Sequence, residues 1–79
     1  MKPKSKMIDG NIYFNNFVVV KESENFFGVY QKWSKYWNTY NHNMLITSGT
    51  TLQQACKKAK MLQIGYDLAR DDLVQDEMY

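Results

Sequence analysis

The sequence has 79 residues, a formal net charge of +2 and a single cysteine, Cys56. This length allows one small domain, which excludes multidomain enzymes and large interior cavities. One cysteine and one histidine exclude an intramolecular disulfide and a Cys/His zinc framework. The lone cysteine favours the cytoplasm. No run of about 20 apolar residues occurs, and the basic start leads into Asp9-Gly10 and not into an apolar stretch, so we expect a soluble, unprocessed protein. Aromatic residues make up 15% of the chain and apolar residues 44%, so a small core has many rings to bury.

The first residues carry polar and turn signals. Residues 1–6 alternate lysine with small polar residues and contain the only proline, which predicts a flexible basic arm. Asp9-Gly10 follows, and both residues tolerate the positive φ of a two-residue hairpin turn. We therefore expect a short hairpin that pairs residues 7–8 with residues 11–14.

The central part of the chain is rich in strand-forming residues. Residues 17–21 are the densest β-branched run and predict the most secure strand, while the polar residues 23–25 predict a turn. Residues 26–33 alternate imperfectly, with aromatic rings on both faces, so one face is expected to cover a helix. Residues 34–43 show no period and predict a long loop or strand extension, and residues 44–47 predict a third strand.

A single helix is predicted after residue 49. Thr50 is expected to cap it, with Gln53 three residues later completing a capping box. One apolar stripe recurs at helical spacing and should face the sheet; its members are Leu52, Ala55, Ala59, Leu62, Tyr66, Ala69 and Leu73. A second stripe, of Met61, Ile64 and Leu68, predicts a dimer seam or a contact with the tail. Because the first stripe does not break at Gly65, we expect the helix to continue through it.

Charge is segregated along the chain. Residues 1–60 carry a net charge of +6, whereas residues 61–79 carry −4. The acidic residues 71–79 are unfavourable at the negative end of a helix dipole, so we expect the helix to stop near Arg70 and an acidic tail to follow. Such asymmetry can orient a partner or be neutralised within a dimer.

The sequence offers little for catalysis or for binding metals and cofactors. Cys56 lies beside the apolar stripe, where free cysteines usually pack as small hydrophobic residues, and no third group is placed to orient His42. Asp67 and Asp71 share a helix face, but a solvated acidic surface explains them better than a cation site. The hydroxyl groups around Gly49 lack the spacing and lysine of a P-loop. We therefore predict a protein that is not an enzyme and has no cofactor or metal site.

One segment combines aromatic rings with lysines more densely than a small core can enclose. Its members predict a partner-binding surface, since Trp and Tyr anchor protein interfaces; they are Tyr30, Lys32, Trp33, Lys35, Tyr36, Trp37 and Tyr40. Flat rings beside cations are also what single-stranded nucleic acid requires. A third interpretation assigns Trp33 and Trp37 to the cover of the helix. The small net charge argues against tight duplex binding.

The order of three predicted strands and a helix resembles the N-terminal domain of HicB-type antitoxins, a partial RNase H-like β-β-β-α module, across roughly residues 17–69. The family's helix start follows the pattern G-x-T-x-x-E-A-x-x-x-A. Matching positions here are Gly49, Thr51, Gln54, Ala55 and Ala59, with Gln54 where the family usually has Glu. The resemblance implies a toxin-binding role. The long aromatic segment before the third strand and the missing DNA-binding part depart from the family, so operator binding is not implied.

Taken together, the sequence predicts a single α+β domain. We expect a three- to four-stranded antiparallel meander over residues 7–47, with one long helix over residues 50–70 packed on one face. The expected function is that of a small non-catalytic protein that regulates or inhibits a protein partner. An antitoxin-like protein or a phage or mobile-element inhibitor of a host nuclease or defence system would fit. The alternative is a single-stranded nucleic-acid-binding module that uses the same surface. A homodimer is a further expectation.

Overall fold

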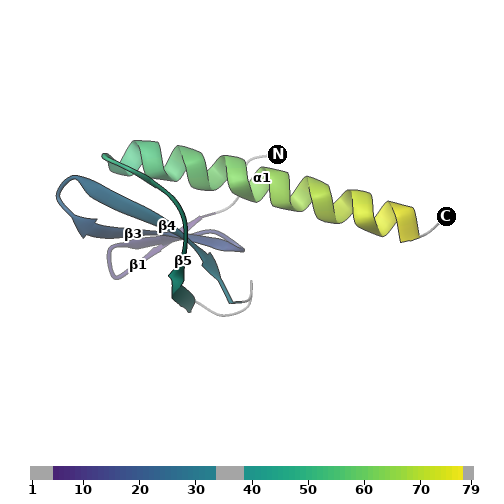
Figure 1. Ribbon diagram of the computed structural model, residues 1–79, viewed down its shortest axis with the longest axis horizontal. Coiled ribbons are helices and arrows are strands. Elements are labelled where there is room, and N and C mark those ends of the chain that lie inside the picture. Colours follow the sequence, from purple (N-terminus) through teal and green to yellow (C-terminus); the bar gives the residue numbers. More distant parts are fainter. Residues whose placement is uncertain (1–4, 34–38, 78–79) are drawn as a thin grey trace.

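The computed structural model describes residues 5–33 and 39–77, with the side chains of the helix described as far as Ala69. Five antiparallel strands form one sheet in chain order, and one helix follows them (Figure 1). The elements are β1 (Lys6–Ile8), β2 (Asn11–Tyr13), β3 (Phe17–Ser23), β4 (Phe26–Lys32), β5 (Tyr40–Gly49) and α1 (Leu52–Glu77). The predicted α+β fold is therefore confirmed, with one strand more than the upper number expected.

The hairpin at the start of the sheet forms where it was predicted. Asp9 and Gly10 have φ angles of 52° and 83°, the left-handed values that a two-residue turn between twisted strands requires. β1 pairs with β2 from Lys6 opposite Tyr13 to Ile8 opposite Asn11. Lys6, which was assigned to the arm, is thus a strand residue.

The two central strands also lie close to their predicted bounds. β3 pairs with β4 from Phe17 opposite Gln31 to Ser23 opposite Phe26, and the polar residues between the strands form the turn. Alternation along β4 places Phe27 and Val29 toward α1. Phe26 points to the opposite face from Phe27 and is partly exposed.

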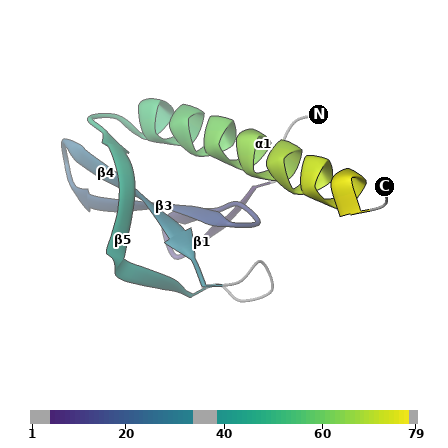
Figure 2. The same ribbon diagram turned by 45° about the vertical axis from the view of Figure 1, so that its right-hand side comes forward.

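β5 differs most from the prediction, since it begins at Tyr40 within the expected loop and runs to Gly49. Its register with β4 shifts twice, between Val29 and Tyr30 and again between Tyr30 and Lys32. These irregularities coincide with a sharp bend, and the first half of β5 lies away from α1 (Figure 2). Extra residues in a bulged strand break the alternation of side chains, which is why the sequence shows no period there.

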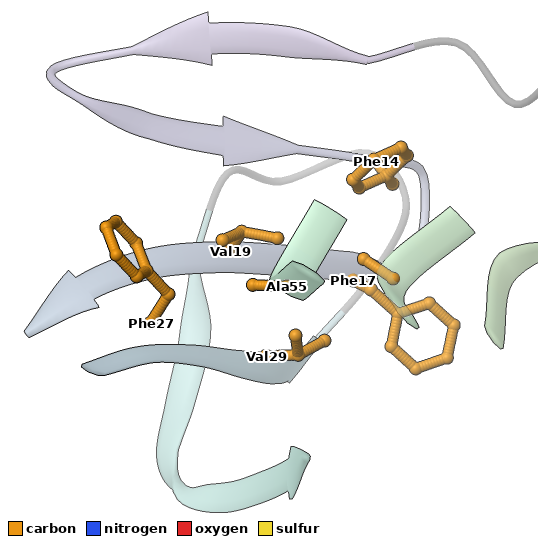
Figure 3. Close-up of a cluster of buried hydrophobic side chains, with 7 residues drawn as sticks. Phe14, Phe17, Val19, Phe27, Val29 and Ala55 are labelled. Atoms are coloured by element: carbon orange, nitrogen blue, oxygen red, sulfur yellow. The ribbon is translucent and has the colours of Figure 1, made fainter. Parts of the chain in front are cut away.

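The core lies between α1 and one face of the sheet. Its buried members are Phe14, Phe17, Val19, Phe27, Val29, Ala55 and Ala59. Figure 3 shows Ala55 directly over the aliphatic side chains of the central strands. The small alanines let the helix backbone approach the sheet, and Phe17 meets the half-buried Tyr66 edge to face with ring centroids 6.1 Å apart. The predicted stripe is confirmed at these positions, although Leu52 and Ala69 are exposed.

One polar side chain belongs to this interface and was not predicted from the sequence. Gln63 is buried on α1, and its amide exchanges two hydrogen bonds of 2.8 Å with Asn16. Asn16 donates its backbone N–H to Gln63 Oε1, and Gln63 Nε2 donates to Asn16 Oδ1. Gln63 Nε2 also donates to Asp67 Oδ1 at 3.0 Å. This bonding fixes the position of the helix relative to the loop between β2 and β3.

The helix starts one residue later than predicted. Thr51 Oγ1 accepts the backbone N–H of Gln54 at 3.2 Å, so Thr51 is the N-cap in place of Thr50. Gln54 Oε1 in turn accepts the backbone N–H and the hydroxyl of Thr50 at 3.0 and 2.9 Å. The predicted capping pair of Thr50 and Gln53 is therefore replaced by Thr51 and Gln54, and the Gln54 side chain returns to Thr50, the residue before the cap.

The helix ends later than predicted. It continues through Gly65, as expected, but its backbone also runs through the acidic residues to Glu77, so the predicted end near Arg70 is wrong. No glycine or proline occurs after Gly65, and each added residue contributes a backbone hydrogen bond that outweighs a dipole penalty of a few tenths of a kcal/mol. The far part of α1 extends beyond the sheet (Figure 1), and the molecule measures 49 × 21 × 21 Å.

Candidate functional site

The predicted aromatic and lysine surface falls at the end of β4 and the start of β5, and its seven residues have different environments. Tyr30 and Lys32 are buried, with only 5% and 7% of their surface exposed. Trp33 is 66% exposed, and Tyr40 is half-buried. Lys35, Tyr36 and Trp37 lie outside the described residues.

Tyr30 belongs to a small aromatic cluster on the side of the sheet away from α1. Its ring centroid lies 5.1 Å from that of Tyr40, and Tyr40 lies 4.6 Å from His42. Gly28 makes room for this ring, since a Cβ at Gly28 would come within 2.8 Å of Tyr30 Cε1. The first half of β5 therefore covers this face with aromatic side chains, and Tyr30 is part of that second packing layer.

A hydrogen bond to a carboxylate fixes the hydroxyl end of Tyr30. Its phenol donates to Glu22 Oε1 on β3. This bond, reinforced by burial and by the negative charge of Glu22, raises the pKa of Tyr30 from 10.0 to about 12. Tyr30 is therefore a neutral hydrogen-bond donor at all ordinary pH values and acts as a structural support for the surface around it.

Lys32 also has a structural role. Its ammonium donates to the carbonyl oxygen of Phe14 at 3.3 Å and lies 5.9 Å from the ring centroid of Tyr13. Burial lowers the pKa of Lys32 from its ordinary value of 10.5. Its backbone N–H donates to Asn16 at 2.8 Å. The charge of Lys32 is thus used to join β4 to the loop after β2 and is not presented to a ligand.

Trp33 has the exposed side chain of the set. Its backbone N–H donates to the carbonyl oxygen of Thr39 at 3.2 Å, which joins the end of β4 to the residue before β5. The backbone that carries the indole directly follows β4 and is held by this hydrogen bond. On β5, the half-buried Tyr40 and the exposed His42 have ring centroids 4.6 Å apart.

A second surface, made of exposed apolar side chains on β5 and α1, was only partly predicted from the sequence. Met44, Leu45 and Ile46 on β5 are all exposed, although the sequence predicted only a short apolar strand there. A groove of about 460 Å³ separates this strand from α1, lined by Ile46, Thr47, Lys58, Met61 and Leu62. The predicted second stripe, Met61, Ile64 and Leu68, is exposed on the helix. A bulged strand exposes consecutive residues. Looking for alternating apolar and polar side chains in residues 44–47 therefore does not reveal this surface.

The groups considered for catalysis do not form a reactive pair. Cys56 is half-buried, and burial raises the pKa of its thiol, with Lys60 acting in the opposite direction. His42 stacks on Tyr40. Within residues 5–33 and 39–69, no group of three or more His, Cys, Asp or Glu side chains could hold a metal ion.

Among the described residues, no helix combines the length and the apolar character that crossing a bilayer requires. Comparison of the chain with protein-family models, with curated proteins and with solved structures gives no match. The similarity to HicB-type antitoxins therefore stays a prediction from the sequence.

Proposed function

We propose that this chain is a non-catalytic binding protein that regulates or inhibits a protein partner, and that the partner docks around Trp33. The observation that carries the proposal is the 66% exposure of Trp33, whereas the other described Phe and Tyr rings are buried or half-buried except Phe26, which is 36% exposed. Leaving an indole in water is unfavourable for an isolated protein, whereas Trp is among the residues that contribute most when an interface covers them.

The surroundings of Trp33 support a preorganised surface. Its backbone is tied to Thr39, and the neighbouring Tyr40 packs on the buried Tyr30. An aromatic anchor whose backbone is already ordered loses little conformational entropy on binding. The chain then continues from Trp33 into the segment that contains Lys35, Tyr36 and Trp37, which we include in the proposed contact.

The proposed partner is a toxin or a nuclease in the cytoplasm. The antitoxin-like order of elements and the matching residues at the start of α1 favour a toxin. The small size and the charge segregation also fit a phage or mobile-element inhibitor that masks a host defence enzyme. In either case the protein would act by covering its partner's surface, with no chemical step of its own.

Quantitative affinity capture from the native host tests this proposal. The wild-type chain is compared with Trp33→Ala and with the matched control Met7→Ala, whose side chain is 64% exposed on β1. We expect a protein that wild type and Met7→Ala retain to be lost by about tenfold or more with Trp33→Ala, while the unfolding midpoint stays unchanged. Equal capture by all three proteins, or a large loss of stability in Trp33→Ala, would overturn the proposal.

A second candidate function is binding of single-stranded nucleic acid by the same surface. The exposed faces of Trp33 and His42 favour it, because bases stack on such rings. The ammonium of Lys32 argues against it, since that group is already bonded to Phe14. Titrating tryptophan fluorescence with oligonucleotides at two salt concentrations decides the matter: quenching that weakens with salt supports this function, and absence of quenching excludes it.

A further inference from the structure

An apolar stripe runs along the outer face of α1, the side that faces away from the sheet. Each member of the stripe follows by two residues a side chain that packs against the core, and two residues turn a helix by about 200°. The stripe therefore points away from the sheet, which covers α1 from one side only among the described elements (Figure 1, Figure 2). Its members are Met61, Ile64 and Leu68, which follow Ala59, Leu62 and Tyr66, and all three are exposed.

This stripe is centred on the middle of the helix. α1 spans residues 52–77 and the stripe spans residues 61–68, so both have their middle between Ile64 and Gly65. A two-fold axis through that point, at right angles to α1, lays a second copy of the helix antiparallel on the first over its whole length. The apolar part of one helix then meets the apolar part of the other. The stripe is thus complementary to itself.

Nothing among the described residues explains the glycine at this midpoint. Gly65 lies in the helix interior, where glycine costs about 1 kcal/mol relative to alanine. A Cβ placed at Gly65 would meet nothing within 4 Å, so the packing of α1 on the sheet does not require a glycine there. Gly65 is exposed and lies one turn after Met61. A position without a side chain lets another backbone come close, and Ile64 of a second copy would occupy the space.

We propose that the outer face of α1 binds the outer face of α1 in a second copy of this chain, with the two helices antiparallel. Met61 of each chain packs on Leu68 of the other, and Ile64 packs on Gly65. The two sheets lie on the far sides of the helix pair, so the dimer has four layers in the order sheet, helix, helix, sheet. The strands take no part in this contact. The inference concerns a surface separate from that of Trp33 and does not rest on the proposed function.

Charge favours a second copy of this chain and the antiparallel direction. Lys57 lies one turn before Met61, and Asp72 lies one turn after Leu68. Because positions 57 and 72 are equally far from the middle of α1, antiparallel helices bring the lysine position of each chain beside the aspartate position of the other. A parallel pair would instead place lysine beside lysine. The segregation of charge along the sequence thus becomes complementary in this dimer.

Sedimentation velocity of the full chain over a range of concentrations tests the inference. The seam has three apolar side chains per chain, so we expect a reversible dimer of twice the 9.4 kDa chain mass, with a Kd between about 1 μM and 1 mM. Met61→Lys and Leu68→Lys should each weaken the dimer about tenfold or more, because each places a charge in the apolar seam.

Two further variants complete this experiment. Met7→Lys is the matched control, since Met7 and Met61 are 64% and 65% exposed, and it should dimerise like wild type. Gly65→Gln introduces a better helix former, so helix content should not fall, but its side chain holds the helices apart and should weaken the dimer about tenfold. A wild type that is still monomeric at about 1 mM, equal weakening by Met7→Lys, or undiminished association of Gly65→Gln would overturn the proposal.

A charge-swap pair tests the direction of the helices. Lys57→Glu and Asp72→Lys should each weaken the dimer several-fold at low salt, because each places like charges beside one another in the antiparallel pair. The double variant should restore association, since the reversed charges again attract. Circular dichroism at low concentration checks that each variant keeps its helix. A double variant that associates no better than either single variant would contradict the antiparallel arrangement.

Discussion

At the scale of single residues, Gln63 shows how a polar side chain stabilises the contact between α1 and the sheet. It is 1% exposed and bonds both the backbone and the side chain of Asn16, 47 positions away in the sequence. Helical spacing places Gln63 on the buried side of α1, four residues after Ala59 and three before Tyr66. A search for apolar periodicity passes over it because glutamine is polar. Its partner is brought to it by the fold, so the sequence could not reveal this role.

Removing the Gln63 side chain should destabilise the folded protein. Gln63→Ala leaves the backbone N–H of Asn16 without its acceptor and opens a cavity, so we expect the free energy of unfolding to fall by about 2 kcal/mol or more. The control variant Gln53→Ala changes an exposed side chain of the same helix. It should alter the free energy of unfolding by less than about 0.5 kcal/mol. Urea unfolding of both variants measures the difference, and equal stability would contradict the assigned role.

Tyr30 predicts a dependence of stability on alkaline pH. Its pKa is about 12 in the folded protein, above the ordinary value of 10.0, so the folded state keeps a proton that the unfolded state loses. The stabilisation is therefore complete below about pH 10 and is lost as the pH rises through about 12. The stability difference between wild type and Tyr30→Phe should shrink over this range, as measured by urea unfolding at each pH. A difference that stays constant would show that Tyr30 titrates normally.

At the scale of elements, the start of α1 depends on neighbouring residues alone. The sequence therefore predicted its capping residue to within one position. Thr51 caps the helix because its hydroxyl reaches the free N–H of Gln54, and Gln54 accepts the N–H of Thr50 just before the cap. β5 is the opposite case. Its bulges depend on pairing with β4 and remove the alternation of side chains. The run of Tyr, Asn and His at its start therefore did not predict a strand of ten residues.

Loss of the cap gives a prediction for this element. Thr51→Ala removes the acceptor for the Gln54 N–H and should lower the free energy of unfolding by about 1 kcal/mol. Thr51→Ser keeps the hydroxyl and should retain most of the stability. Thermal unfolding of the two variants compares them directly. If Thr51→Ala were as stable as Thr51→Ser, the hydroxyl would not be the cap.

At the scale of the whole molecule, the fold divides the aromatic residues into three groups. Phe14, Phe17 and Phe27 fill the core below α1. Tyr30 and Tyr40 pack on the other side of the sheet, a second layer that the sequence did not indicate. Trp33 is left outside both. The fold thus buries more of the rings than the composition suggested, and Trp33 is the most exposed of the described Phe, Tyr and Trp residues.

The exposure of Trp33 can be measured directly in the Trp37→Phe variant, which keeps Trp33 as its one tryptophan. We expect the folded variant to emit like indole in water, to be quenched by iodide nearly as well as free tryptophan, and to change little when urea unfolds it. Blue-shifted emission with strong protection from iodide, both lost on unfolding, would place Trp33 in the interior and contradict the proposed binding surface.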